Sequence, residues 1–172
     1  GSWDNIHMNG GTDTKRTQKS KDNYYKEWED IIENLKFFQC IVVWTPFNEA
    51  WGQFDTEAVV EFTQGKDNTR LINAASGGNH RECGNFVDMH TYPGPSYPLH
   101  YDPLINVIGE YGGIGLEIKN HTWFNGSWSY NTVDTREELT GNYTLFINNL
   151  ISKSLGFNPN NFKPCFKSSG FI

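Results

Sequence analysis

The chain has 172 residues, a formal net charge of −6, and six Trp, eight Tyr and twelve Phe residues. This length suits one ordinary domain, and no apolar stretch approaches the roughly 20 residues of a transmembrane helix. The lysine and arginine residues are scattered rather than gathered into a basic stripe. We therefore expect neither nucleic acid nor a membrane among the partners of this chain.

Residues 1–20 are polar and predict an N-terminal loop. An amphipathic helix is expected from Asp22 to Phe38, because apolar residues recur there at spacings of three and four and draw one stripe. A stripe of this kind packs on a sheet. Its members are Tyr24, Trp28, Ile31, Leu35 and Phe38.

A buried strand is predicted at residues 41–44, which form a short run of β-branched and aromatic residues. Pro46 cannot donate to a sheet ladder, so it ends this strand. Glu49 then lies just past the C-terminal end of the strand, where parallel α/β folds place their chemistry. Aromatic residues flank Glu49, and apolar surroundings favour a carboxyl that acts as a general acid. These residues are Trp44, Phe47 and Trp51.

Three further strands are expected, at residues 70–73, 86–90 and 105–109, and a short helix capped by Asp55 or Thr56 precedes them. Strands that alternate with helices or loops indicate a parallel sheet. The carboxyl ends of parallel strands meet at one edge, so the groups that follow these strands should lie near Glu49. Those groups are the glycine loop at residues 76–79, His90 with Tyr92, and Glu110.

The C-terminal third contains a further helix signal and three glycosylation sequons. Thr135 and Glu138 form a capping box that opens a helix. The sequons begin at Asn120, Asn125 and Asn142. Secretion would account for them, and so would chance in an asparagine-rich chain, so they leave the localisation unassigned.

Glu49 and Glu110 at the same end of two parallel strands would form a carboxylate pair, which is the equipment for cleaving a glycosidic bond. The segments VVWTPFNEAWGQFDT and VIGEYGGIG resemble the catalytic barrel of glycoside hydrolase family 2, the group of β-galactosidases, β-glucuronidases and β-mannosidases. The intervening DNTRLINAASGGNH and DMHTYPGP fit the same group. The resemblance covers roughly residues 20 to 154.

The resemblance implies a role for each matching residue. Glu49 corresponds to the acid/base and Glu110 to the nucleophile. Asn48 would hold the sugar 2-hydroxyl, and Tyr92 would hydrogen-bond the nucleophile. The expected substrate-binding set is Asn48, Trp51, Asn79, His90 and Tyr92.

The resemblance also implies a fold. We expect a partial (β/α)₈ barrel at residues 21–154 that corresponds approximately to strands 4 to 7 with their helices, while strands 1–3 and 8 are missing. Residues 155–172 form an atypical tail, because Pro159 and Pro164 would break a central strand there. The apolar edges of so few strands favour self-association.

The function implied is retaining hydrolysis of a β-glycoside in carbohydrate metabolism, without a cofactor, by a β-galactosidase-like fragment of a longer enzyme. By itself the fragment is expected to be inactive or feebly active. The alternative is an inactive remnant that serves as a carbohydrate-binding or interaction module, and an unrelated α/β protein with incidental glutamates is a third, weaker reading. No metal is expected, because the one ligand set that can be drawn has no recognised spacing. That set is His80, Cys83, Asp88 and His90.

Overall fold

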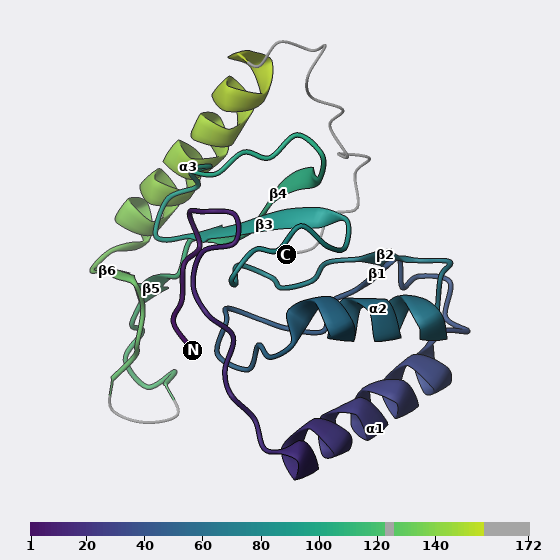
Figure 1. Cartoon of the computed structure of the whole chain (residues 1–172). Coiled ribbons are helices and arrows are strands. Elements are labelled where there is room, and N and C mark those ends of the chain that lie inside the picture. Colours follow the sequence, from purple (N-terminus) through teal and green to yellow (C-terminus); the bar gives the residue numbers. More distant parts are fainter. Residues whose placement is uncertain (123–125, 157–172) are drawn as a thin grey trace. The chain divides into compact units, whose positions relative to one another are not determined.

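The computed structural model describes residues 1–122 and 126–156, and side chains only up to residue 152 at its C-terminal end. This part of the chain contains three helices and six short strands, which pair as three separate two-stranded parallel sheets (Figure 1). It divides into two units. The first comprises residues 1–92 and 96–111, and the second comprises residues 93–95 and the chain from residue 112 onward.

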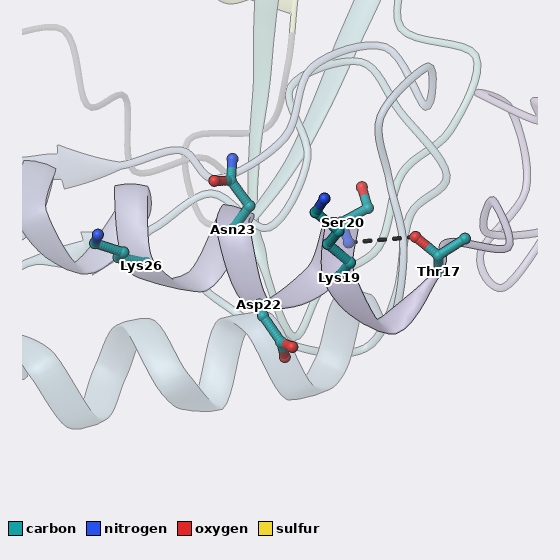
Figure 2. A pocket seen from close by; sticks show the side chains of 6 residues that line it. All are labelled: Thr17, Lys19, Ser20, Asp22, Asn23 and Lys26. Atoms are coloured by element: carbon teal, nitrogen blue, oxygen red, sulfur yellow. Dashed lines mark hydrogen bonds between the residues drawn. The ribbon is translucent and has the colours of Figure 1, made fainter.

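Two helices belong to the first unit. Helix α1 (Gln18–Leu35) begins at Thr17, whose hydroxyl accepts a hydrogen bond from the Ser20 N–H at 3.3 Å. Exposed polar side chains along its first turns line a shallow hollow (Figure 2). Helix α2 (Thr56–Lys66) is capped from a distance: the Thr56 N–H donates to a carboxylate oxygen of Asp13 at 2.9 Å. The sequence predicted a local cap there, but the Asp55 side chain makes no capping hydrogen bond.

The apolar stripe of α1 is confirmed in its first half and wrong in its second. Tyr24 stacks on Phe47 with ring centroids 5.4 Å apart, and Trp28 packs edge-on against Trp44 at 6.1 Å. Ile32 continues this row into the core and is fully buried. Residues four apart lie along one ridge of a helix. This ridge faces the core, so the other positions of the predicted stripe are exposed to solvent. Those exposed positions are Ile31, Leu35 and Phe38.

Strands β1 (Val43–Trp44) and β2 (Leu71–Ile72) pair in parallel. An isolated parallel bridge between Asn48 and Ser76 lies beyond their C-terminal ends. The bridge keeps the register of the strand pair, so it holds the loops that follow the two strands side by side. The loop of Glu49 and the glycine loop are therefore adjacent.

Strands β3 (Phe86–Thr91) and β4 (Ile105–Tyr111) form the second parallel pair of this unit. Their register shifts once: Met89 is opposite Ile108, but His90 is opposite Glu110. Gly109 is therefore the extra residue of a β-bulge. A bulge re-aims the side chains that follow it, and here it places Glu110 directly across from His90.

The second unit contains β5 (Ile114–Leu116), β6 (Asn131–Val133) and α3 (Arg136–Gly156). The predicted start of α3 is confirmed, because the Glu138 N–H donates to the Thr135 hydroxyl at 3.1 Å. The Glu138 carboxylate accepts from the N–H of Asp134 at 2.9 Å, one residue before the N–H that a capping box uses. Helix α3 packs on both strands. The sequence did not predict these strands, which are only three residues long.

The expected partial (β/α)₈ barrel is wrong. The strands at the four predicted positions do not join into one sheet: β1 pairs with β2, and β3 pairs with β4. Between β2 and β3, the Ile72 N–H donates to the side-chain oxygen of Asn85 at 2.8 Å and the Ile72 carbonyl accepts from the Asn85 N–H at 2.7 Å, but no strand ladder follows. Within the described residues no helix lies between β2 and β3 or between β3 and β4. The result is a small mixed α/β arrangement of short parallel pairs without barrel closure.

Several expectations stay predictions. Most of the predicted C-terminal tail, residues 157–172, lies outside the described residues. Each described strand has one ladder partner, so sheet edges exist, and self-association through them is untested. In the described part of the chain, no helix is both long and apolar enough to cross a membrane.

Candidate active site

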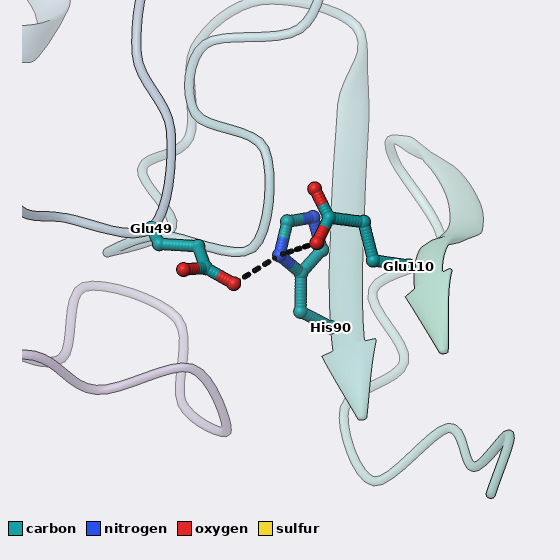
Figure 3. Close-up of side chains that lie close together, drawn as sticks. All are labelled: Glu49, His90 and Glu110. Carbon is teal, nitrogen blue, oxygen red and sulfur yellow. Dashed lines mark hydrogen bonds and ion pairs between the residues drawn. The ribbon is translucent and has the colours of Figure 1, made fainter. Parts of the chain in front are cut away.

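Glu49 and Glu110 converge on one nitrogen of His90. The Nδ1 of His90 lies 2.8 Å from Oε1 of Glu49 and 3.5 Å from Oε2 of Glu110. Figure 3 shows the two carboxylates reaching the imidazole from separate segments, Glu49 from the loop after β1 and Glu110 from β4. One oxygen of each glutamate and the histidine nitrogen all lie within 4.8 Å of one another. The chain thus brings together two carboxylates that are 61 positions apart in sequence.

The backbone around Glu49 adopts an uncommon conformation. Both Glu49 (φ 46°) and Ala50 (φ 64°) lie in the left-handed region, which residues with a Cβ rarely adopt. The Glu49 N–H donates to the carbonyl of Ser76 at 2.8 Å, which holds the turn against the glycine loop. Backbone strain of this kind costs about 1–3 kcal/mol per residue and gathers at functional sites. It points to a functional constraint on the Glu49 side chain.

Glu110 is held by the β-bulge and by a tyrosine. The Tyr92 hydroxyl donates to Oε2 of Glu110, the same oxygen that approaches His90. The Glu110 side chain is 46% exposed and that of Glu49 is 20% exposed. Both carboxylates are therefore held by protein groups and still open to solvent, as a pair must be to act on a bound molecule.

His90 itself is enclosed, with no exposed side-chain surface. Gly77, at φ 63°, lies so close to the imidazole that a Cβ there would fall 2.2 Å from Cγ of His90. Only glycine combines this φ with such a close approach. The glycine loop predicted from the sequence therefore has a concrete role, which is to pack backbone against the ring of His90.

Behind His90 lies a buried polar set. The Ser76 hydroxyl is 2.9 Å from Nε2 of His90 and 3.0 Å from Oδ2 of Asp88. Asn73 donates to the same Asp88 oxygen at 2.7 Å. Asp88 is 4% exposed, and burial raises the pKa of its carboxyl. The other carboxylate oxygen of Asp88 and the amide oxygen of Asn73 have no hydrogen-bond partner among the described residues.

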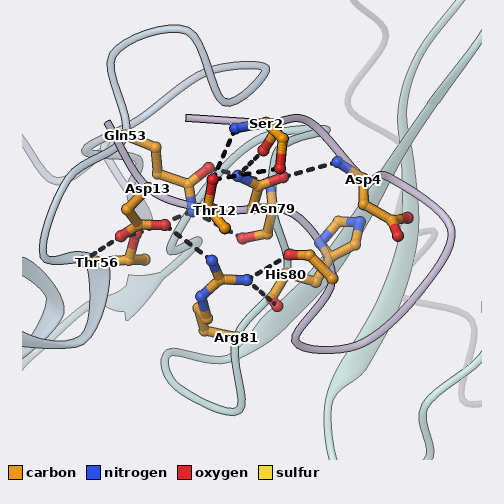
Figure 4. A network of polar contacts seen from close by, with 10 residues as sticks. Ser2, Asp4, Thr12, Asp13, Gln53, Thr56, Asn79, His80 and Arg81 are labelled. Carbon is orange, nitrogen blue, oxygen red and sulfur yellow. Dashed lines mark hydrogen bonds and ion pairs between the residues drawn. The ribbon is translucent and has the colours of Figure 1, made fainter. Parts of the chain in front are cut away.

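Four of the predicted site residues are brought together, and two others are not. Glu49, His90, Tyr92 and Glu110 form the cluster. Asn48 is exposed and lines a hollow beside α1. Asn79 is fully buried, and its side chain binds the backbone of Ser2 and Asp4, at 2.8 Å in each case (Figure 4). The buried side chain of Asn79 therefore has a structural role in this structure, and its expected role in substrate binding stays a prediction.

The aromatic surroundings predicted for Glu49 are largely absent. Trp44 is buried and donates its indole N–H to Asp67 at 2.9 Å. Phe47 belongs to the core with Phe54. Of these three aromatic residues, Trp51 is 77% exposed and presents its ring to solvent. It lies two residues after Glu49 in the sequence.

The trio of Glu49, His90 and Glu110 is also the one described group of three His, Cys, Asp or Glu side chains with ligand atoms close enough to hold a metal ion. In this structure its atoms are engaged with one another and with Tyr92, so the group is organised by hydrogen bonds. The ligand set considered from the sequence does not form, since His80 and Cys83 belong to no such group within the described residues.

Sequence reasoning placed the loop of Ser76 near Glu49 but gave Ser76 no role, and it missed Asp88 and Gly109 as members of this site. One signal was present: Asp88 and His90 are two apart in a predicted strand, so they point to the same face. The bulge at Gly109 left no signal. Without it, Glu110 would be opposite Thr91 rather than His90.

Comparison of the chain with models of known protein families and with curated protein sequences finds no match. The functional interpretation therefore rests on the residues of the site and on their geometry.

Proposed function

We propose that this chain carries the active site of a retaining glycoside hydrolase that acts on β-glycosides. The observation that supports it most is the approach of the two glutamates, whose nearest oxygens lie within 4.8 Å. Retaining enzymes hold their carboxyl groups about 5–5.5 Å apart, whereas inverting enzymes need about 6.5–9.5 Å to admit a water molecule between carboxylate and sugar. The short separation favours direct attack by one carboxylate.

In the first step, a carboxylate oxygen of Glu110 forms a bond to the anomeric carbon while the bond to the leaving oxygen breaks. Glu49 gives its proton to that oxygen, so the aglycone departs as a neutral alcohol. The Tyr92 hydroxyl, which donates to Glu110, orients the nucleophile before the attack. The product is a covalent glycosyl-enzyme.

In the second step, Glu49 is ionised and acts as a base. It removes a proton from water, the water oxygen bonds to the anomeric carbon, and the ester bond to Glu110 breaks. The sugar leaves with its original β configuration, and Glu49 is again protonated. Two inversions give net retention. No step requires a cofactor.

The test begins with turnover. Residues 1–172 are incubated with aryl β-galactoside, β-glucuronide and β-mannoside, and the anomer first released is identified by proton NMR. We expect slow release of the β-anomer from one of them. First release of the α-anomer would contradict the retaining assignment, and release from none of them would contradict the proposed activity of this chain.

The roles of the two glutamates are tested by rescue with azide. In Glu110→Ala, azide takes the place of the nucleophile and gives an α-glycosyl azide. In Glu49→Ala, azide attacks the glycosyl-enzyme and gives the β-glycosyl azide. Glu82→Ala, which removes a glutamate outside the carboxylate cluster, is the control and needs no rescue. Reversed products would exchange the two roles.

A second candidate function is carbohydrate binding without hydrolysis. Trp51 favours it, because it exposes 77% of its surface next to the loop of Glu49, and exposed aromatic faces are recognition surfaces. Calorimetric titration with β-linked oligosaccharides separates the candidates. Binding that Trp51→Ala abolishes, in a chain that has no turnover, would establish a binding module instead.

A further inference from the structure

A continuous line of polar groups runs from Glu49 into the interior. It passes from Oε1 of Glu49 to Nδ1 of His90 at 2.8 Å, from Nε2 of His90 to the Ser76 hydroxyl at 2.9 Å, and from that hydroxyl to Oδ2 of Asp88 at 3.0 Å. Each contact lies within hydrogen-bond distance. The line joins a partly exposed carboxyl to a buried one through two groups that can both donate and accept.

The donors in this line are interdependent. Ser76 has one hydroxyl proton, so it donates either to Asp88 or to His90 and accepts from the other. A neutral imidazole likewise has one N–H, on Nδ1 or on Nε2. With a neutral imidazole, all three hydrogen bonds can therefore form in two arrangements of one shared proton, which is on Asp88 in one and on Glu49 in the other. A third arrangement places that proton on His90 as an imidazolium, with both carboxyls ionised, and lies between the two.

We propose that Asp88 is a buried positioning residue that exchanges a proton with Glu49 through Ser76 and His90. The proposal rests on the proposed function, in which Glu49 is the acid and base. Asp88 touches neither the substrate nor the reacting atoms. It decides whether Nδ1 of His90 donates to Glu49 or accepts from it.

The exchange is balanced by three transfers. Oδ2 of Asp88 gives its proton to the Ser76 oxygen, the original Ser76 proton moves to Nε2 of His90, and the Nδ1 proton of His90 moves to Oε1 of Glu49. Asp88 ends ionised, Glu49 ends protonated, and Ser76 and His90 regain neutral forms. The reverse series returns the proton. No oxidant, reductant or further reactant takes part.

The surroundings of Asp88 suit a carboxyl that is sometimes neutral. One of its oxygens has no hydrogen-bond partner among the described residues, and a buried carboxylate left in that state is costly. Gly109 makes room for this oxygen, because a Cβ there would fall 2.0 Å from it. Burial also raises the pKa of Asp88, against the opposing effects of Asn73, Ser76, His90 and the Gly109 N–H. The bulge at Gly109 thus makes room for the Asp88 carboxyl and places Glu110 opposite His90.

The line of groups from Glu49 to Asp88 is called the relay below. Other titratable groups lie near it and affect its pH dependence. Glu110 and its donor Tyr92 are near Nδ1 of His90, and the field of His90 also reaches His80. The field of Asp88 reaches Tyr97, whose pKa is raised mainly by burial. A test must therefore observe His90 directly.

The decisive measurement is ¹⁵N NMR of the imidazole nitrogens of His90 in the full chain, assigned with His90→Gln. In the wild type we expect both nitrogens to show shifts midway between those of a protonated and an unprotonated nitrogen, because the two neutral arrangements interconvert. Two shifts at the protonated value would identify a fixed imidazolium and overturn the relay. In Asp88→Asn and in Ser76→Ala we expect the unequal shifts of one fixed tautomer. Two variants are used because either change is close to the core, and circular dichroism confirms that each is folded.

Asp102→Asn is the matched control. It removes a carboxylate from another histidine, His100, at 2.6 Å, but in an exposed pair. We expect it to leave the His90 shifts and the turnover unchanged. Identical His90 shifts in the wild type, Asp88→Asn and Ser76→Ala would overturn the relay.

Kinetics separate the relay from the proposed function. We expect Asp88→Asn to lower kcat about tenfold, less than the roughly 10²–10⁴-fold typical of a direct acid or base, with KM unchanged and a flatter pH profile. Tautomer changes in a chain without turnover would support the relay and refute the hydrolase. Turnover with unchanged His90 shifts in the variants would support the hydrolase and refute the relay.

Discussion

Two polar networks in the first unit use similar residue types and serve different ends. The carboxylate site consists of Glu49, Ser76, Asp88, His90, Tyr92 and Glu110. The N-terminal network, shown in Figure 4, ties the first residues of the chain to the loop that ends at Arg81 and to α2. Both networks bury side chains deeply, so burial alone does not distinguish them.

The buried side-chain amides of the N-terminal network have hydrogen-bond partners. Asn79 accepts from the Asp4 N–H and donates to the Ser2 carbonyl, at 2.8 Å each. Gln53 accepts from the Asn79 N–H at 3.0 Å and donates to the carbonyl of Asn79 at 2.7 Å. These amides do not titrate near neutral pH, and each of their polar side-chain atoms has a hydrogen-bond partner. A network of this kind fixes structure.

The carboxylate site differs in three respects. It has partnerless oxygens on Asp88 and Asn73, positive φ at Glu49, and an exposed carboxylate at Glu110. The first two features cost stability, and the third leaves a carboxylate open to solvent. The comparison shows that incomplete satisfaction, strain and exposure occur together where chemistry is expected, while complete satisfaction marks structural polarity.

The largest effect is expected from the glutamates. Glu49→Gln and Glu110→Gln should lower kcat/KM on an activated β-glycoside by about 10³-fold, since each removes a group that acts on the reacting atoms. The free energy of unfolding should change by less than about 1 kcal/mol, because both side chains are partly exposed. Urea unfolding measures it, with the exposed Glu61→Gln as the control. A large loss of stability together with retained turnover would show that the two glutamates stabilise the fold and do not act in catalysis.

The pH dependence of stability should come from the N-terminal network. Burial lowers the pKa of His80 to about 4 from a model-peptide value of 6.5. Below pH 6.5 His80 takes up a proton in the unfolded chain but not in the folded chain. The contribution of His80 to the free energy of unfolding is therefore fully present above pH 6.5 and is lost as the pH falls toward 4. The loss is about 3 kcal/mol at most. His80→Asn should remove this part of the slope in urea unfolding, while the exposed His121→Asn should not. Equal slopes in the two variants would contradict the assignment.

Gly77→Ala should damage the carboxylate site through His90. Its Cβ would lie 2.2 Å from the imidazole at a positive φ, so the ring must move. A displacement of about 1 Å costs on the order of 10²-fold in rate, which steady-state kinetics will show. Gly65→Ala is the matched control, because open space surrounds Gly65 in α2. It should stabilise the chain by about 0.5–1 kcal/mol and leave kinetics unchanged. Similar kinetics for both variants would show that His90 does not position the glutamates.

Asn79→Ala should have the smallest and purely structural effect. It leaves the Asp4 N–H and the Ser2 carbonyl without their partner, which costs about 2 kcal/mol of unfolding free energy. The kcat of the folded protein should not change. Asn34→Ala, an exposed helical asparagine, should shift stability by less than about 0.5 kcal/mol. A loss of substrate affinity in Asn79→Ala would support the predicted sugar contact.

Local features could be predicted from the sequence. The spacing of apolar residues predicted α1 and the packing of Tyr24 and Trp28, although the helix begins at Gln18 rather than Asp22 and ends at Leu35 rather than Phe38. Local patterns also predicted the start of α3 and the positions of β3 and β4. The positions of Glu49 and Glu110 just beyond or at the end of apolar strands were predicted correctly too. These features depend on residues within a few positions of one another, so they are legible in the chain.

The way in which these elements combine could not be predicted from the sequence. The alternation of a strand does not encode a register shift, so the bulge that turns Glu110 toward His90 was not predictable. Asn79 follows β2 and His90 lies in β3, yet the Asn79 side chain is tied to Ser2 and that of His90 to Glu49. The strand pattern predicted one sheet, but β2 and β3 do not pair. Each outcome depends on hydrogen bonds between side chains and distant or irregular backbone, which sequence periodicity does not specify.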